Sequence, residues 1–230
     1  MTDIILIETS TALCSAALSR DGKVISYKES STPHSHASLT APFIKEILDE
    51  NSLAVGDCKA VCVSKGPGSY TGLRVGVSTA KGLCFGSGIP LLSLGTLDVL
   101  AWQAITEKLL PEGCRYIVPL VDARRMEVYT AVFQTDGTRK TETAPVIVDG
   151  GSFTDILSEG PVLFIGDAAD KCRDVIRGEN AHFVQCCPKA SSMAIPATKA
   201  FQDGLFEDTA YFEPFYLKDF IATKPKKNLF

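Results

Sequence analysis

Apolar residues in this chain occur either in runs, which are typical of buried strands, or at the spacing of an amphipathic helix. Runs and alternating patterns predict strands at residues 4–7, 13–18, 23–27, 60–63, 89–93, 116–121, 127–134, 145–148 and 162–165. The dipeptides Asp21-Gly22 and Asp136-Gly137 predict tight hairpin turns. Helical spacing predicts helices at 35–50, 73–84, 97–110, 152–157 and 194–204. Pro42 predicts that the first helix begins near Thr40 or kinks there.

The order of these elements is three strands followed by alternating helices and strands, and a shorter version of the same order comes after it. The turn-rich segment 109–113 predicts a linker between the two. We therefore expect an α/β protein with an N-terminal unit at 1–108 and a smaller C-terminal unit at 109–230. The last helix and the tail are candidates for packing back on the first unit.

Composition narrows the class of protein. The chain has 230 residues, 45% of them hydrophobic and 22% charged, which is ordinary for a globular protein. Its net charge of −4 gives no overall attraction to nucleic acid or anionic lipid. No apolar run approaches the roughly 20 residues that span a bilayer, and the N-terminus lacks the basic region of a signal peptide. Eight cysteines without a C-x-x-C pair predict buried free thiols.

The turn richest in glycine is the segment 66–72, here called the glycine loop, which lies between a predicted strand and a predicted helix. Such a junction directs backbone N–H groups outward, and Ser69 or Thr71 can cap the helix. The spacing matches neither the P-loop nor the dinucleotide fingerprint. The candidate anion- or nucleotide-binding residues are Gly66, Pro67, Gly68, Ser69, Thr71, Gly72, Arg74 and Glu8.

Arg74 lies in the first helical turn, where a cation opposes the helix dipole. Two interpretations remain open: Arg74 binds an anion, or it forms an ion pair with a carboxylate such as Glu8 at the end of the first strand.

The helix after the glycine loop has one face almost without side chains, because Gly72, Gly76 and Ala80 recur every four residues. Glycine weakens a helix, so this face must be closely approached by another backbone, either the sheet or a partner. We favour a partner and expect Gly76→Leu to block its binding without unfolding the chain. The predicted partner interface comprises Gly72, Gly76, Ala80, Leu83, Leu39 and Phe43.

Other candidate sites are weaker. Asp122 ends a predicted strand, and the turn 166–170 is acidic and therefore repels phosphate, which argues against ATP held between the two halves. His34 and His36 precede the first helix and would lie on different faces, so capping or partner contact is favoured over a metal site. The lysines of 224–227 are a candidate phosphate contact, although plain solvation is commoner.

Several of these segments resemble the TsaB family, also called YeaZ, and they occur in order over nearly the whole chain. The glycine loop matches the family signature, with Tyr70 where the family usually has Phe. The other matching pieces are Ile7–Ser10, Cys14–Leu18, His34-Ser35, Asp122–Arg124, Glu127–Tyr129 and the closing segment Pro214–Lys218.

The resemblance implies a two-domain actin-like ATPase or sugar-kinase-like fold, related to ribonuclease H, with a degenerate second domain. It implies a non-catalytic cytoplasmic subunit that binds the catalytic paralog TsaD and, with the ATPase TsaE, helps form threonylcarbamoyladenosine next to the anticodon of tRNA. A homodimer through the same helices stays open, and contact with tRNA is expected to be indirect. No metal or other cofactor is expected in this chain, while ATP or ADP is a candidate ligand of the complex.

Two other classes of function stay open. One is a regulator that binds a nucleotide at the glycine loop, or a weak ATPase or small-molecule kinase; a kinase needs two phosphate-binding turns, and only one is present. The other is a metallopeptidase, for which the sequence offers neither a metal set nor an activated nucleophile.

Overall fold

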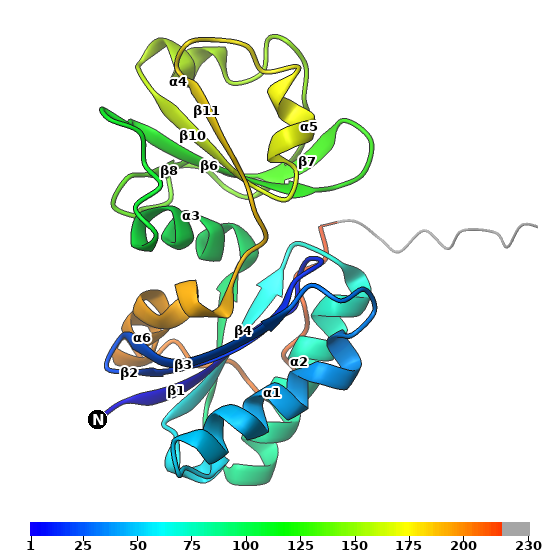
Figure 1. The fold of residues 1–230 in the computed structure, drawn as a ribbon, viewed down its shortest axis with the longest axis vertical. Helices are drawn as coiled ribbons and strands as arrows, with labels where there is room; N and C mark the ends of the chain where they lie inside the picture. Colours follow the sequence, from blue (N-terminus) through cyan, green and yellow to red (C-terminus); the bar gives the residue numbers. More distant parts are fainter. Residues whose placement is uncertain (218–230) are drawn as a thin grey trace, which may run out of the picture.

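The computed structural model describes residues 1–217, so the predicted lysine contact at 224–227 and Lys218 of the closing motif lie outside the described residues. The described chain forms two β-sheets that lie one above the other with helices between them (Figure 1). No helix among the described residues is long and apolar enough to cross a membrane.

The first sheet has five strands in the order β3-β2-β1-β4-β5. β2 pairs antiparallel with β3 across the Asp21-Gly22 turn, which confirms the predicted hairpin. β1 pairs antiparallel with β2 and parallel with β4, and the central strands β1 and β4 are buried. The strands are β1 (Asp3–Glu8), β2 (Cys14–Arg20), β3 (Lys23–Ser30), β4 (Ala60–Gly66) and β5 (Leu91–Gly95).

Helices cover both faces of this sheet because alternate residues of β1 point to opposite sides. Ile5 and Ile7 pack against α1 (His36–Glu50) and α2 (Tyr70–Ser87), while Ile4 and Leu6 pack against α3 (Thr96–Thr106) and α6 (Ala194–Gln202). α6 follows the second sheet in sequence but contacts the first (Figure 1). A short 3-10 helix, η2 (Ala190–Met193), leads the chain into α6.

The second sheet has the order β11-β10-β6-β7-β9, with β8 also paired to β6. α3 lies between the two sheets and contributes Val99 to the first core and Leu97 and Leu100 to the second. The other face carries α4 and α5. The elements are β6 (Tyr116–Asp122), β7 (Glu127–Thr130), β8 (Phe133–Gln134), β9 (Ala144–Ile147), α4 (Thr154–Ser158), β10 (Val162–Gly166), α5 (Ala169–Arg173) and β11 (Ala181–Gln185), with η1 (Val55–Asp57) in the first half.

Several helix boundaries differ from the prediction: α2 (Tyr70–Ser87) is longer at both ends than the predicted 73–84, and α6 ends at Gln202 rather than 204. α1 continues through Pro42, which with Ser38 lies on the exposed side, so the carbonyl that proline leaves unbonded can be hydrated. α3 ends at Thr106 rather than 110, and Leu109 and Leu110 instead pack as half-buried residues against the second core.

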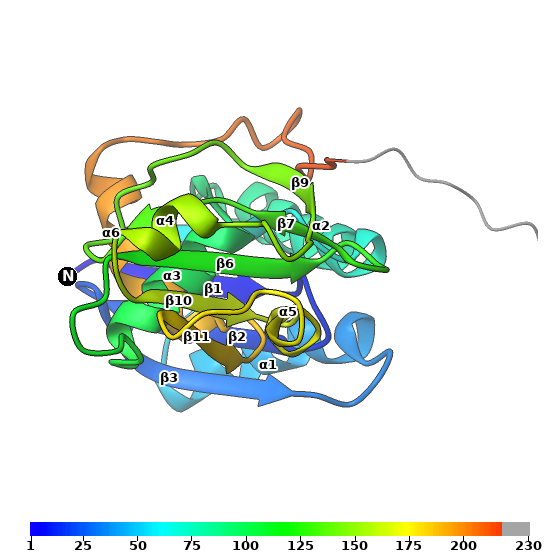
Figure 2. The same cartoon turned by 90° about the horizontal axis from the view of Figure 1, so that it is seen from above.

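β1 and β6 run in the same direction in the view of Figure 2. Their carboxyl ends therefore lie toward the same end of the molecule. The glycine loop rests on the turn that follows β1, and the Asp122 turn continues from β6, so the tertiary structure brings these two candidate sites to one side.

Candidate functional site

The glycine loop connects β4 to α2 and rests on the turn that follows β1. Ser69 is the cap of α2: its Oγ accepts a hydrogen bond from the Gly72 N–H at 3.3 Å. The Ser69 N–H donates to the Ser10 carbonyl at 2.6 Å. Of the two predicted capping residues, the structure therefore selects Ser69, and Thr71 is exposed.

Gly68, Gly72 and Gly76 are required because the turn that follows β1 approaches them closely. A Cβ on Gly68 would lie 2.2 Å from the Ser10 carbonyl oxygen, and one on Gly72 would lie 2.1 Å from that of Thr9. A Cβ on Gly76 would lie 2.3 Å from Thr9 Oγ1, which already donates to the Gly72 carbonyl at 2.8 Å.

The prediction that Gly72, Gly76 and Ala80 face a partner is therefore wrong. All three are buried, and Ala80 belongs to the core under α1 and α2. The three small residues do recur every four positions, as predicted, but the helix face that they form points toward the core. Gly76→Leu would disturb this packing, so it cannot separate partner binding from folding.

The outer face of α2 is offset by two residues from the inner face, as Ser78 is from Gly76. Two residues correspond to a rotation of about 200° around the helix axis. The outer face is also nearly bare: a Cβ on Gly82 or Gly86 would meet nothing within 4 Å. Phe85 lies beside them and is 88% exposed. We call Ser78, Gly82, Phe85 and Gly86 the outer face of α2.

The remaining predicted interface residues are only partly available. Leu83, Phe43 and Leu39 are half-buried, and the first two pack against the core. They can contribute edges to an interface, but the exposed area on α2 comes from its outer face.

Glu8 lies at the end of β1, beneath the glycine loop, and is fully buried. Its Oε1 accepts the Ser10 N–H at 2.6 Å, whereas Oε2 has no partner among the described residues. Burial raises the pKa of Glu8 to about 7, a larger effect than the hydrogen bonds from Ser10, which lower it. The buried carboxyl is therefore largely neutral below pH 7.

Arg74 does not pair with Glu8, contrary to one of the two interpretations. Its guanidinium carbon lies 4.0 Å from the centre of the Tyr70 ring, and its Nε donates to the Tyr216 hydroxyl at 3.4 Å. The centres of the two tyrosine rings lie 4.9 Å apart. Beside them, the Phe215 N–H donates a hydrogen bond to the Lys65 carbonyl at 2.7 Å. The closing sequence motif thus packs on the glycine loop, a contact that local sequence patterns cannot reveal.

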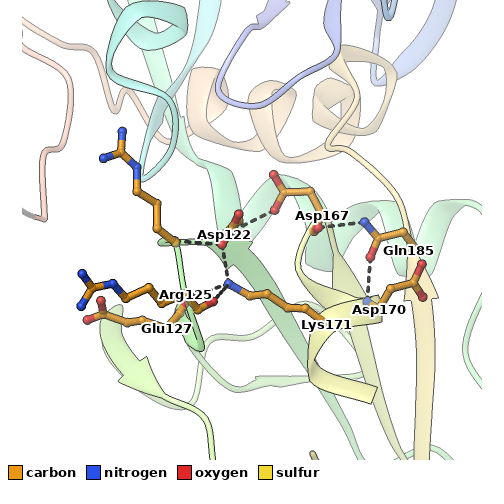
Figure 3. Close-up of polar contacts among 8 residues, drawn as sticks. Asp122, Arg125, Glu127, Asp167, Asp170, Lys171 and Gln185 are labelled. Carbon is orange, nitrogen blue, oxygen red and sulfur yellow. Dashed lines mark hydrogen bonds and ion pairs between the residues drawn. The ribbon is translucent and has the colours of Figure 1, made fainter. Parts of the chain in front are cut away.

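A second polar cluster lies where β6 and β10 end (Figure 3). Lys171 on α5 forms an ion pair with Asp122 and donates to the carbonyls of Arg125 at 2.9 Å and Glu127 at 2.8 Å. The Asp122 N–H donates to Asp167 at 2.9 Å. Burial raises the pKa of Asp167 to about 6. Sequence reasoning found the acidic residues but missed Lys171, whose position on a short helix carries no local signal.

The histidines do not form a metal centre with the residues that the structure describes, and no group of metal-binding side chains occurs among them. His36 Nε2 instead forms a hydrogen bond with the Thr11 carbonyl at 2.9 Å, which attaches the start of α1 to the loop after β1.

Comparisons with known proteins agree with this geometry. Residues 28–226 match the family model described as TsaD: tRNA N6-adenosine threonylcarbamoyltransferase. The chain is 28% identical to the tRNA threonylcarbamoyladenosine biosynthesis protein TsaB of Escherichia coli K12 over 96% of both chains. It is 32% identical to the protein of the same name from Bacillus subtilis 168, over 71% of this chain and 70% of the relative.

Solved structures establish the fold. YeaZ from Pseudomonas aeruginosa superposes with a TM-score of 0.82 at 24% identity, covering 94% of this chain and 100% of that one. A dehydratase activator from Clostridium difficile with bound ADPNP superposes with a TM-score of 0.50 at 11% identity, covering 89% and 96%. A polyphosphate/ATP-glucomannokinase from Arthrobacter has the same TM-score at 10% identity, covering 89% and 100%. The predicted actin-like, sugar-kinase-like fold class is confirmed.

Proposed function

Because the chain belongs to the TsaB family of tRNA threonylcarbamoyladenosine biosynthesis proteins, we propose that it is the non-catalytic, partner-binding subunit of the cytoplasmic assembly that forms this nucleoside. In this proposal it docks on a TsaD-like catalytic paralog, and a TsaE-like ATPase acts on the pair.

The observation that carries the proposal is the outer face of α2. An exposed phenylalanine beside two glycines with open space above them allows a second helix to approach closely, and the aromatic ring supplies apolar contact area. In a free helix, glycines at these positions cost stability. Their presence on an exposed face is best explained by a partner that needs the room.

The interior of the first half supports a non-catalytic role. The close approach at Gly68 and Gly72 is made by the backbone of residues 9 and 10, so these glycines require no bound phosphate to explain them. Glu8 is enclosed beneath the loop and is largely neutral below pH 7, which suits a structural carboxyl better than a metal ligand.

The second half supports the same conclusion. The carboxylate of Asp122, at the end of β6, is paired with the Lys171 ammonium, which also donates hydrogen bonds to the carbonyls of Arg125 and Glu127. A group held in this way is occupied within the chain and is poorly placed to act as a general base. Among residues 1–217, the turn 166–170 at this edge carries the carboxyl groups of Asp167 and Asp170, so it is a poor counterpart to the glycine loop for binding the phosphates of a nucleotide.

Gly82→Leu tests the proposal. We expect the variant to fold, because the added side chain enters open space and leucine is a better helix former than glycine by about 0.8 kcal/mol. We expect it to lose co-elution with the TsaD-like paralog in size-exclusion chromatography, because the side chain fills the space that a partner helix would occupy.

Lys199→Leu is the matched control, since Lys199 is exposed on α6, away from α2. It should co-elute with the paralog as the wild type does. Unchanged co-elution of a folded Gly82→Leu protein would contradict the proposal. Loss of self-association alone, measured by sedimentation, would indicate that this face joins two copies of the chain.

A further inference from the structure

The loop between β6 and β7 has a backbone conformation that its sequence does not favour. Arg124 and Arg125 are both in the left-handed region, with φ of 71° and 50°. The Ala123 N–H donates to the Glu127 carbonyl at 3.2 Å, and the Glu127 N–H donates to that of Arg124 at 3.1 Å. Glycine and asparagine adopt such backbone more readily than arginine. Turn formation therefore does not explain why two arginines stand here.

The loop is held firmly in this conformation. Asp122 Oδ1 accepts the Arg124 N–H at 2.9 Å, while the Lys171 ammonium bonds the Arg125 and Glu127 carbonyls. In Figure 3 the labelled Arg125 side chain extends away from Lys171. A backbone fixed in this way lowers the conformational entropy that is lost when its side chains bind a ligand.

The guanidinium groups of Arg124 and Arg125 form no hydrogen bond or ion pair with the described residues, although both residues are exposed. Most other arginines are engaged within the chain. The engaged ones and their partners are Arg20 with Asp3, Arg74 with Tyr216, Arg139 with Asp98, Arg173 with Asp170 and Arg177 with the Asp174 carbonyl.

We propose that residues 122–127, here called the arginine loop, bind backbone phosphate of the tRNA substrate. Guanidinium groups bind phosphate oxygens in bidentate geometry, and such contacts need local charge rather than a basic protein. Four carboxylates lie in the loop and the neighbouring turn, and three of them are compensated: Asp122 is paired with Lys171, Asp170 is paired with Arg173, and burial raises the pKa of Asp167 to about 6. Glu127 is the fourth, and the charges of Arg124 and Arg125 exceed its charge. The inference rests on the proposed function, and it adds a direct tRNA contact to a chain expected to reach tRNA only through its partner.

The position of the loop fits this role. β6 and β1 run in the same direction (Figure 2), so the arginine loop and the N-terminal end of α2 lie toward the same end of the molecule. Lys171 acts as a positioning residue, since it touches the loop backbone and not the ligand.

The test measures binding of unmodified tRNA across a series of salt concentrations, with the isolated chain and with its complex with the TsaD-like paralog. The double variant Arg124→Gln/Arg125→Gln should bind more weakly. The slope of log affinity against log salt should fall by about two, one for each lost phosphate contact. Lys171→Met should weaken binding less and should speed amide exchange in the arginine loop, because the arginines remain but their backbone is released.

Arg115→Gln is the matched control, because Arg115 is exposed at the opposite end of β6 and its guanidinium also has no partner among the described residues. It should leave the salt slope unchanged. An unchanged slope in the double variant, with the complex still formed, would overturn the proposal. Weaker binding to the paralog with an unchanged tRNA slope would also overturn it and assign the arginines to a protein carboxylate. If the wild-type chain failed to bind the paralog, the proposed function would be contradicted. The salt dependence of tRNA binding by the isolated chain would still decide whether the arginine loop contacts phosphate.

Discussion

Gly72→Ala is expected to destabilise the protein by about 3 kcal/mol. The methyl group would lie 2.1 Å from the Thr9 carbonyl oxygen, a contact that only movement of the backbone can relieve. Such movement would also strain the hydrogen bond from Thr9 Oγ1 to the Gly72 carbonyl. Urea unfolding, followed by circular dichroism, would measure the loss as a lower midpoint at unchanged slope.

Gly82→Ala on the same helix is the control, and its expected effect has the opposite sign. Its methyl group would meet nothing within 4 Å, so the replacement should stabilise the protein by about 1 kcal/mol through helix propensity alone. Equal effects of the two substitutions would show that contact with the β1 turn does not determine the inner face of α2.

Glu8→Gln is expected to stabilise the protein at alkaline pH and to have little effect in acid. Burial raises the pKa of Glu8 from 4.5 to about 7 in the folded protein. Well below pH 4.5 the carboxyl is protonated in both the folded and the unfolded state and does not alter their balance. As the pH rises to about 7, the unfolded chain ionises first, so the wild type loses stability; the full cost is roughly 3 kcal/mol. Glutamine keeps an oxygen for the Ser10 N–H and does not ionise.

The measurement is the free energy of unfolding of both proteins from pH 4.5 to pH 8. The difference between the variant and the wild type should grow across this range, because the other titrating groups are common to both and cancel. Asp98→Asn is a suitable control, since it changes a carboxylate that is partly exposed and paired with Arg139. A difference that stays constant with pH would mean that Glu8 is ionised in the folded protein.

The glycine loop shows how far local patterns can predict a site. A strand, a turn with glycines and serine, and a helix are encoded by neighbouring residues, so the loop was predicted from the sequence, and its cap was narrowed to Ser69 or Thr71. The partners of Arg74 were not, because Tyr216 is far away in the sequence and aromatic rings can satisfy a cation as well as a carboxylate can. The burial of Glu8 likewise depends on the layers stacked around β1.

The elements, the two-part α/β order, the family and the spacing of small residues along α2 all follow from the amino-acid sequence. Which side of α2 faces the core depends on the fold, because helical periodicity gives a spacing but not the direction in which a face points, and both sides of this helix are rich in glycine. The fold likewise determines that Lys171 holds the arginine loop, since that contact joins α5 to a hairpin far from it in the chain. Local interactions define elements, whereas burial and long-range polar contacts define which of their surfaces remain free to act.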